Sequence, residues 1–398
     1  MAGHAASHRR GRRLALAVVL GAVLATGCAP QLQLRTAEVP EASQAVLVGD
    51  FLGKTEVDFR DELVLSAQQG RLMTVSVTDA TGAEVPGELA NGGTEWHIPA
   101  GILELSTQYT VKATVVDRYG TALTQDAAFT TIVPSNVLDY DVSVADGATY
   151  GVGMPITITF NKMIADRAAV EQRLQVTTST PVEGSWSWRG DRTVSYRPKE
   201  YWPAGVKVSM TADLRGVEPE PGLFGVENTT VNFQTGNAVI ATVDAATHMM
   251  TVRRNGVVER TVPITTGKPG WETRSGIKVI MSKQRHVIMD ASTLGVDKED
   301  PEYYRLDVDY ALRITSSGEF VHAAPWSVAS QGVANVSHGC VGLSTANASW
   351  FYNSANVGDI VQVINTGRPQ DRGNGITVWN ESWDSWKAGS ALAPAPPA

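Results

Sequence analysis

The stretch EFVHAAPWSVASQGVANVSHGCVGLS, residues Glu319 to Ser344, carries the features from which the fold of the C-terminal part of the chain is deduced. It begins as an apolar segment that ends near His322, continues as a loop rich in Gly, Ala and Ser, and closes on the tetrapeptide SHGC at 337–340. The next residues, STANASWFYNSA, have helical character and begin with a Ser that is a favoured N-cap. We therefore expect a strand, a long loop, a sharp turn and a short helix in this order.

The residue types in this stretch indicate a nucleophilic thiol at Cys340. A thiol needs a base or a local positive field to become reactive, and an imidazole supplies either. Gly339 allows a sharp turn and a close backbone approach. The amides of Gly339 and Cys340 could then face a carbonyl oxygen and form an oxyanion hole. A Cys and a His in one segment are weak evidence by themselves, because a free Cys is commonly a small buried hydrophobe.

The segments on either side of this stretch are predicted to be β structure. Ala238 to Gly267 reads as three strands, with a turn at Asp244–Thr247 and a strong hairpin signal at Asn255-Gly256. IKVIMSK and HVIMD extend the sheet, and VGDIVQVIN closes it. The only helix expected in this region is the one that begins at Ser344.

From about Ala45 to Thr235 short alternating segments are separated by Gly, Pro, Asn and Asp turns, which is typical of β-sandwiches. A weak internal repeat supports two copies. LSTQYTVKATVVD followed by AFTT is echoed by YWPAGVKVSMTADL followed by VNFQT. We expect two tandem immunoglobulin-like sandwiches with a boundary near Pro134. Because they contain no cluster of His, Cys or carboxylates, a spacer or binding role is their default interpretation.

The composition is that of a globular protein, with 398 residues, 43% of them hydrophobic and 19% charged. The formal net charge of −8 argues against a nucleic-acid partner, which would require a basic patch. The chain therefore has enough apolar material for several cores, but its bulk composition names no partner.

The N-terminus resembles a bacterial lipoprotein signal. Four arginines precede an apolar run, Leu14 to Ala25, that is too short to span a bilayer comfortably. The run ends in LATGC, so Cys28 would become the lipidated first residue of the mature chain. Ala25 departs from the Leu that such signals usually carry at this place, and an ordinary secretory signal remains the alternative. If Cys28 carries lipid, Cys340 is the other of only two cysteines and a lone thiol in an exported protein.

The arrangement of His322, a spacer and Ser337-His338-Gly339-Cys340 resembles the signature of the L,D-transpeptidase family. The likeness is strongest to the mycobacterial lipoprotein subtype with two immunoglobulin-like domains, through HAAPWS, NVSHGC and ANASWFY, and it extends over Ala45 to Gly389. It implies a mostly β fold: two tandem immunoglobulin-like β-sandwiches followed by a β-rich L,D-transpeptidase catalytic domain with a short helix after the nucleophile.

The resemblance also implies roles for individual residues. Cys340 would be the nucleophile and His322 the base or ion-pair partner, while His338 would complete the catalytic set. Gly339 and Cys340 would supply the oxyanion hole. The substrate pocket would be lined by Tyr304, Met289, Trp326 and Ser337. Plain core packing is an alternative for Tyr304, Met289 and Trp326, and a purely structural role is one for His338.

Three positions depart from the family pattern. Gly342 replaces an Asn that usually follows the nucleophile by two residues, and Ala323 stands where close relatives have Ser. Leu294 stands where relatives often carry an aromatic residue over the pocket. Gly342 either loosens the site, so that Asn would speed acylation, or adopts a backbone conformation closed to other residues.

The predicted organisation follows from these observations, and its parts are given in order along the chain. They are a lipoprotein signal peptide (1–27), a tether (28–44), immunoglobulin-like domain 1 (45–133), immunoglobulin-like domain 2 (134–236), the catalytic domain (237–366), a Trp-rich C-terminal subdomain (367–390) and a disordered Pro/Ala tail (391–398). The three tryptophans of the C-terminal subdomain are expected to dock onto the preceding domain.

The activity implied by the resemblance is formation of 3→3 peptidoglycan cross-links through a thioester on Cys340. The partners would be a donor tetrapeptide stem and an acceptor amine, carbapenem β-lactams as inhibitors, and the outer face of the cell membrane through a lipid anchor. No metal or organic cofactor is implied, since an ionised thiol is nucleophilic enough. Two alternatives stay open: an L,D-carboxypeptidase that hydrolyses the same thioester, and a wall-binding protein with a weakened site.

Overall fold

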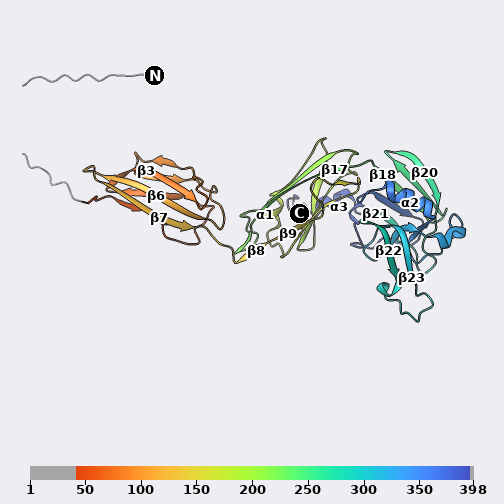
Figure 1. Ribbon diagram of the computed structural model, residues 1–398. Coiled ribbons are helices and arrows are strands. Elements are labelled where there is room, and N and C mark those ends of the chain that lie inside the picture. Colours follow the sequence, from red (N-terminus) through yellow and green to blue (C-terminus); the bar gives the residue numbers. More distant parts are fainter. Residues whose placement is uncertain (1–41, 395–398) are drawn as a thin grey trace, which may run out of the picture.

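The computed structural model describes residues 42–394, so the predicted signal, the tether up to residue 41 and Cys28 lie outside the described residues. Three β-rich bodies follow one another along the chain (Figure 1). The first and second are sandwiches, and the third carries the SHGC segment. None of the helices in the described range is long and apolar enough to cross a membrane.

The first sandwich packs two antiparallel sheets around one core. Its alternation is clear in β6, where Tyr109, Val111, Ala113 and Val115 are buried and the residues between them are more exposed. The sheets have the strand orders β1 (Val46–Val48), β2 (Leu63–Gln68), β5 (Glu95–Ile98), β4 (Glu88–Ala90) and β3 (Gly70–Asp79), β6 (Gln108–Asp117), β7 (Ala122–Thr130).

The second sandwich also packs two sheets around one core and contacts the first through a short parallel pair, β8 (Asn136–Leu138) and β16 (Leu223–Gly225). Phe224 of β16 belongs to the core of the first sandwich. The two sheets have the orders β10 (Thr149–Tyr150), β17 (Asn228–Thr235), β15 (Lys207–Asp213), β12 (Leu174–Thr178) and β13 (Gly184–Arg189), β14 (Thr193–Pro198), β11 (Ile156–Phe160), β9 (Tyr140–Val142). The helix α1 (Arg167–Glu171) precedes β12. The prediction of two tandem sandwiches is confirmed.

The third body is built from two sheets and the helix α2 (Thr345–Ser354). One sheet has the order β20 (Val257–Pro263), β19 (Met249–Arg254), β18 (Val239–Asp244), β26 (Ile360–Ile364), β21 (Gly276–Val279). The other has the order β22 (Ser282–Asp290), β23 (Arg305–Arg313), β24 (Phe320–Ala323), β25 (Val341–Leu343). Short 3₁₀ helices, η1 (Ala291–Leu294) and η2 (Pro325–Ser330), follow β22 and β24.

Two local predictions for this body are confirmed. Asn255 and Gly256 join β19 to β20 with φ values of 49° and 83°, which is the left-handed backbone that this kind of hairpin requires. Ser344 is the N-cap of helix α2, and its hydroxyl accepts a hydrogen bond from the amide of Asn347 at 3.3 Å. Its buried residues, Ala348 and Phe351, pack into the core shared by the two sheets.

The C-terminal tryptophans dock onto both the second sandwich and the third body, since Trp379 shares an apolar cluster with Val279 and Ile360 of the third body. The indole N–H of Trp386, in α3 (Trp383–Ala388), donates to the carbonyl of Ser185 at 2.8 Å. The indole N–H of Trp379, in η3 (Val378–Asn380), donates to Gly153 at 2.8 Å. Arg197 of β14 stacks on both rings, at 4.9 and 5.0 Å from their centroids. The terminal segment thus joins the second and third bodies.

Candidate active site

A cavity of about 260 Å³ opens beside the SHGC turn. It collects residues from β22, β23, β24, β25, the loops between them and the segment after β20, which are far apart in the sequence. Those predicted from the sequence are Cys340, His322, His338, Met289, Tyr304, Trp326, Ser337 and Gly342. The remaining lining residues are Thr265, Leu306, Ala324, Ser327 and Val336.

Cys340 and His322 come together because β24 and β25 pair in parallel. In this register Val321 lies beside Val341, and His322 lies beside Gly342. Cys340, the residue before β25, therefore lies level with the first residue of β24. The long loop between the two strands is the crossover that a parallel pair needs.

The sulfur of Cys340 is held by the backbone of the segment before β24. Its S–H group donates weakly to the carbonyl of Gly318, with a distance of 3.7 Å, and it accepts a hydrogen bond from the amide of Phe320. Burial raises the pKa of the thiol to about 12, and the amide of Phe320 opposes this change. At neutral pH the resting group is therefore a protonated thiol.

His322 is oriented for the role of a base. It is 5% exposed, and its Nδ1–H group donates to the carbonyl of Ala323 at 2.7 Å. This bond leaves the lone pair of the imidazole on Nε2. Burial lowers the pKa of His322 to about 4, so the ring is neutral at physiological pH. Ala323 is sufficient for this bond because only its backbone takes part.

The SHGC turn is closed by the side chain of Ser337. Its hydroxyl donates to the carbonyl of Cys340 at 2.6 Å and accepts from the amide of Gly339 at 3.1 Å. Gly339 has a φ of 120°, which explains the glycine at this place. One expectation changes: the amide of Gly339 is engaged inside the turn, so it does not stand ready for a substrate oxygen. Ser337 lines the pocket, but its hydroxyl is also committed to the backbone.

His338 is held by a carboxylate that the sequence did not reveal. Its Nε2 lies 2.6 Å from Oε2 of Glu302, and Lys268 donates to the same oxygen at 2.6 Å. The rings of Trp271 and Tyr304 pack against the imidazole, at centroid distances of 5.0 and 4.8 Å. The ring of His338 is thus fixed at the edge of the pocket, which favours a structural role for it.

The three predicted wall residues all line the cavity. Met289 is buried, and burial raises the pKa of Tyr304 to about 12. Trp326 is 53% exposed at the mouth, with its ring 6.0 Å from that of His322. The side chain of Leu294 lies outside the described residues.

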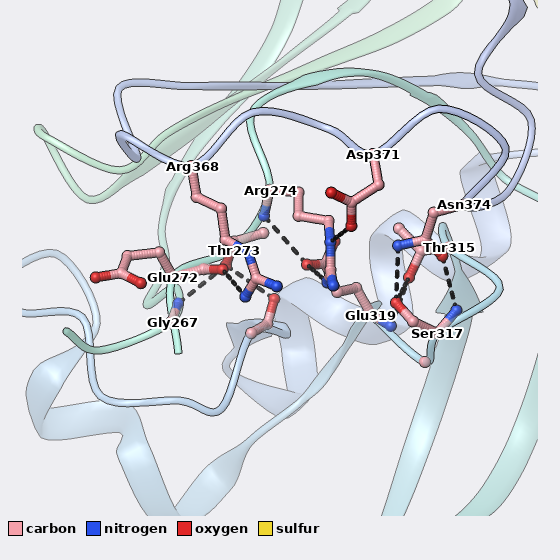
Figure 2. A network of polar contacts seen from close by, with 12 residues as sticks. Gly267, Glu272, Thr273, Arg274, Thr315, Ser317, Glu319, Arg368, Asp371 and Asn374 are labelled. Carbon is pink, nitrogen blue, oxygen red and sulfur yellow. Dashed lines mark hydrogen bonds and ion pairs between the residues drawn. The ribbon is translucent and has the colours of Figure 1, made fainter. Parts of the chain in front are cut away.

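A polar network behind the SHGC turn was also missed from the sequence (Figure 2). Thr273 donates to the carbonyl of Gly339 at 2.8 Å and accepts from the amide of Gly267 at 2.9 Å. Arg274 reaches both Glu319 and Asp371 (Figure 2). Thr273 therefore supports the SHGC turn directly, and Arg274 links Glu319 to the segment after β26. Among the described residues no group of His, Cys, Asp and Glu is arranged to hold a metal ion.

Known proteins share both parts of this architecture. A family described as a bacterial Ig domain matches residues 54–218, and one described as the L,D-transpeptidase catalytic domain matches residues 238–363. L,D-transpeptidase 2 of Mycobacterium tuberculosis is 41% identical over 330 residues, which cover 83% of this chain and 80% of that protein. L,D-transpeptidase 5 of the same species is 33% identical over 379 residues, which cover 92% and 78%.

A solved structure agrees with these sequence matches. The structure of the transpeptidase LdtMt1 in complex with imipenem aligns at 39% identity and a TM-score of 0.50, covering 58% of this chain and 100% of that chain. The identity and the coverage of the relatives lead to one conclusion. The chain belongs to the L,D-transpeptidase family.

Proposed function

We propose that this protein is a cysteine-dependent peptidoglycan L,D-transpeptidase that forms 3→3 cross-links through an acyl-enzyme on Cys340. The observation that carries the proposal is the pairing of β24 with β25, which brings Cys340 and the neutral, buried His322 into one cavity. The names of the relatives support the reaction class. The intact pocket argues against a wall-binding protein with a weakened site.

The first step is acylation by the donor stem. As the sulfur of Cys340 attacks the carbonyl of the third stem residue, the thiol proton moves to Nε2 of His322. The terminal D-Ala then leaves as an amine when its C–N bond breaks, and the imidazolium returns the proton to it. The product is a thioester. The low pKa of His322 favours a neutral starting pair over a preformed thiolate–imidazolium pair.

The second step transfers the acyl group to an amine of another stem. The amine attacks the thioester carbon, gives its proton to Nε2 of His322, and the sulfur leaves and recovers that proton. The backbone amide of Cys340 would donate a hydrogen bond to the oxyanion. The amide of Gly339 can join it only if it releases the hydroxyl of Ser337.

Intact-mass measurement after exposure to a tetrapeptide stem tests the proposal. We expect the mass of the stem minus D-Ala on the wild-type protein, and no adduct on Cys340→Ala. Addition of an acceptor stem should discharge the adduct into a cross-linked dimer. Discharge to free tripeptide alone would indicate the carboxypeptidase, and an adduct on Cys340→Ala would refute the assignment of the nucleophile.

Two further parts of the proposal concern inhibitors and location. One solved relative is a complex with imipenem, and we expect a carbapenem to acylate Cys340 of this chain. We also propose that Cys28 carries a lipid on the outer face of the cell membrane, with the two sandwiches as a spacer. Cys28→Ala should abolish partitioning into detergent, and unchanged partitioning would favour an ordinary secretory signal.

A further inference from the structure

A fully buried ion pair lies directly behind the candidate nucleophile. Glu319, directly before β24, is 4% exposed, and Lys278 of β21 is 1% exposed. The ammonium of Lys278 donates to Oε2 of Glu319 at 2.5 Å. Oε1 of Glu319 accepts from the backbone amide of Arg274 at 3.1 Å and from its guanidinium at 3.0 Å. Burying a charge costs free energy unless the charge is closely paired, so the ion pairs hold the carboxylate of Glu319 in one position.

The position of Glu319 relative to the sulfur is its main feature. The carbonyl of the preceding residue, Gly318, and the amide of the following residue, Phe320, are the two backbone groups that contact Sγ of Cys340. The side chain of Glu319 also lies under the SHGC turn, since a Cβ atom at Gly339 would be 3.7 Å from its Cγ. One anchored side chain thus fixes the backbone on both sides of itself.

The anchor extends to the segment after β26. Lys278 donates a second hydrogen bond, to the amide oxygen of Gln370 at 2.7 Å, and Arg274 donates to Asp371 at 2.6 Å. Figure 2 shows Arg274 between Glu319 and Asp371. The cluster therefore joins β21, β24 and the terminal segment at a point next to the nucleophile.

We propose that Glu319 is a positioning residue for Cys340: through its ion pairs with Lys278 and Arg274 it holds the Gly318 carbonyl and the Phe320 amide against the sulfur. The inference rests on the proposed role of Cys340 as the nucleophile. A displacement of about 1 Å at a reacting group can lower a rate about 100-fold, so a rigid anchor at this place matters for acylation.

The two charges of the pair act on the thiol in opposite directions. Glu319 raises the pKa of Cys340, whereas Lys278 lowers it. Loss of the carboxylate alone should therefore lower the pKa of the thiol, and loss of the ammonium alone should raise it. The other ionisable groups around the sulfur include Arg313, Tyr304, His322 and His338, none of which changes in the variants below.

The test measures Cys340 in the full chain carrying Cys28→Ala, in which Cys340 is the only thiol. Alkylation by iodoacetamide is followed across pH for Glu319→Gln and Lys278→Met. We expect the profile of the first variant to move to lower pH and that of the second to higher pH, by about one pH unit each. Acylation by a carbapenem should fall about 10-fold or more in both. A purely structural role cannot produce opposite shifts.

Glu171 of the second sandwich provides a matched control. It is also 4% exposed and hydrogen-bonded, to the indole of Trp188 at 2.8 Å, but it is remote from the pocket. Glu171→Gln should leave the alkylation profile and the acylation rate unchanged. Shifts in the same direction, or no shift, in folded Glu319→Gln and Lys278→Met would overturn the proposal.

A third variant covers the case in which a single substitution prevents folding. Glu319→Leu with Lys278→Met replaces the pair by apolar side chains of similar volume, a change that buried pairs often tolerate. We expect it to fold, to alkylate near the wild-type pH and to acylate about 10-fold more slowly. Wild-type acylation in this variant would overturn the proposal. If wild-type protein alkylates at Cys340 but no stem peptide acylates it, the proposed function fails and the alkylation profiles still test the anchor.

Discussion

A Cβ atom at Gly342 would lie 2.9 Å from Cγ2 of Thr265, closer than such atoms approach each other. The two residues form an antiparallel bridge, with Gly342 N–H donating to Thr265 at 2.9 Å and Thr265 N–H donating to Gly342 at 3.0 Å. Gly342 lies in β25 and not in the left-handed region. The sequence-based alternative of a special backbone conformation is therefore wrong, and the reason for this glycine is steric.

The first prediction follows from this contact. Gly342→Asn should disturb the bridge and slow acylation about 10-fold, because overpacking typically costs about 1–3 kcal/mol. This reverses the expectation, drawn from the family pattern, that Asn would speed acylation. Adding Thr265→Ser removes Cγ2 but keeps the hydroxyl that donates to Ala334 at 2.8 Å, and it should restore the rate. Single-turnover acylation by one β-lactam measures both, and a faster Gly342→Asn single variant would contradict the steric explanation.

The second prediction concerns the proton transfer by His322. His322→Ala should lower acylation by about 10²–10⁴, the usual contribution of a positioned general base. Because the pKa of His322 is lowered to about 4 and that of Cys340 is raised to about 12, the neutral pair persists between these values. The wild-type acylation rate should therefore be nearly flat from about pH 5 to pH 9. A rate that rises with a midpoint near 6.5 would show an ordinary, solvated imidazole instead.

The third prediction concerns the hydroxyl that closes the SHGC turn. Ser337→Ala removes the bonds to Gly339 N–H and to the carbonyl of Cys340, each contributing about 0.5–1.5 kcal/mol. Acylation should slow about 10-fold or more, since the nucleophile is then less firmly oriented. Ser349→Ala, on helix α2, is the control and should keep the wild-type rate. Equal rates for the two variants would mean that the backbone alone defines the turn.

The fourth prediction concerns a buried carboxyl at the junction of the second and third bodies. Asp359 is 0% exposed, and its Oδ1 has no hydrogen-bond partner among the described residues. Its Oδ2 accepts from the amide of Asn356 at 2.7 Å. Beside it Gly151 N–H donates to Val357 and Gly153 N–H donates to Gly358, so the carboxyl lies where the two bodies meet.

Burial raises the pKa of Asp359 to about 7, from an ordinary value of 3.8. Between these values the folded state binds the proton more tightly than the unfolded state, so this group makes the protein less stable as the pH rises. Over the whole range the free energy of unfolding falls by an amount on the order of 4 kcal/mol, because one pKa unit corresponds to about 1.4 kcal/mol. Asp359→Asn should therefore raise the melting temperature more at pH 8 than at pH 5. An equal change at both values would show that the carboxyl does not titrate in this range.

The sequence alone determined the features that depend on local pattern. Alternation of apolar and polar residues predicted the sandwiches, since every second side chain of a half-buried strand faces the core. Asn255-Gly256 predicted the hairpin, because few residues adopt the left-handed backbone that its turn requires. The pairing of His322 with Cys340 in one site followed from a signature whose members lie in a single stretch. Ser344 as the start of the helix is equally local.

The tertiary structure alone decided the contacts that support this site, because they join residues that no periodicity relates. Glu319 and Lys278 are 41 residues apart, and each looks like an ordinary surface charge in its own segment. Glu302 reaches His338 across 36 residues, and Thr265, in the segment after β20, leaves no room for a side chain at Gly342. A charge is recognised as buried, and a glycine as sterically required, only when the opposing surface is known. That surface is produced by packing, which a local pattern does not encode.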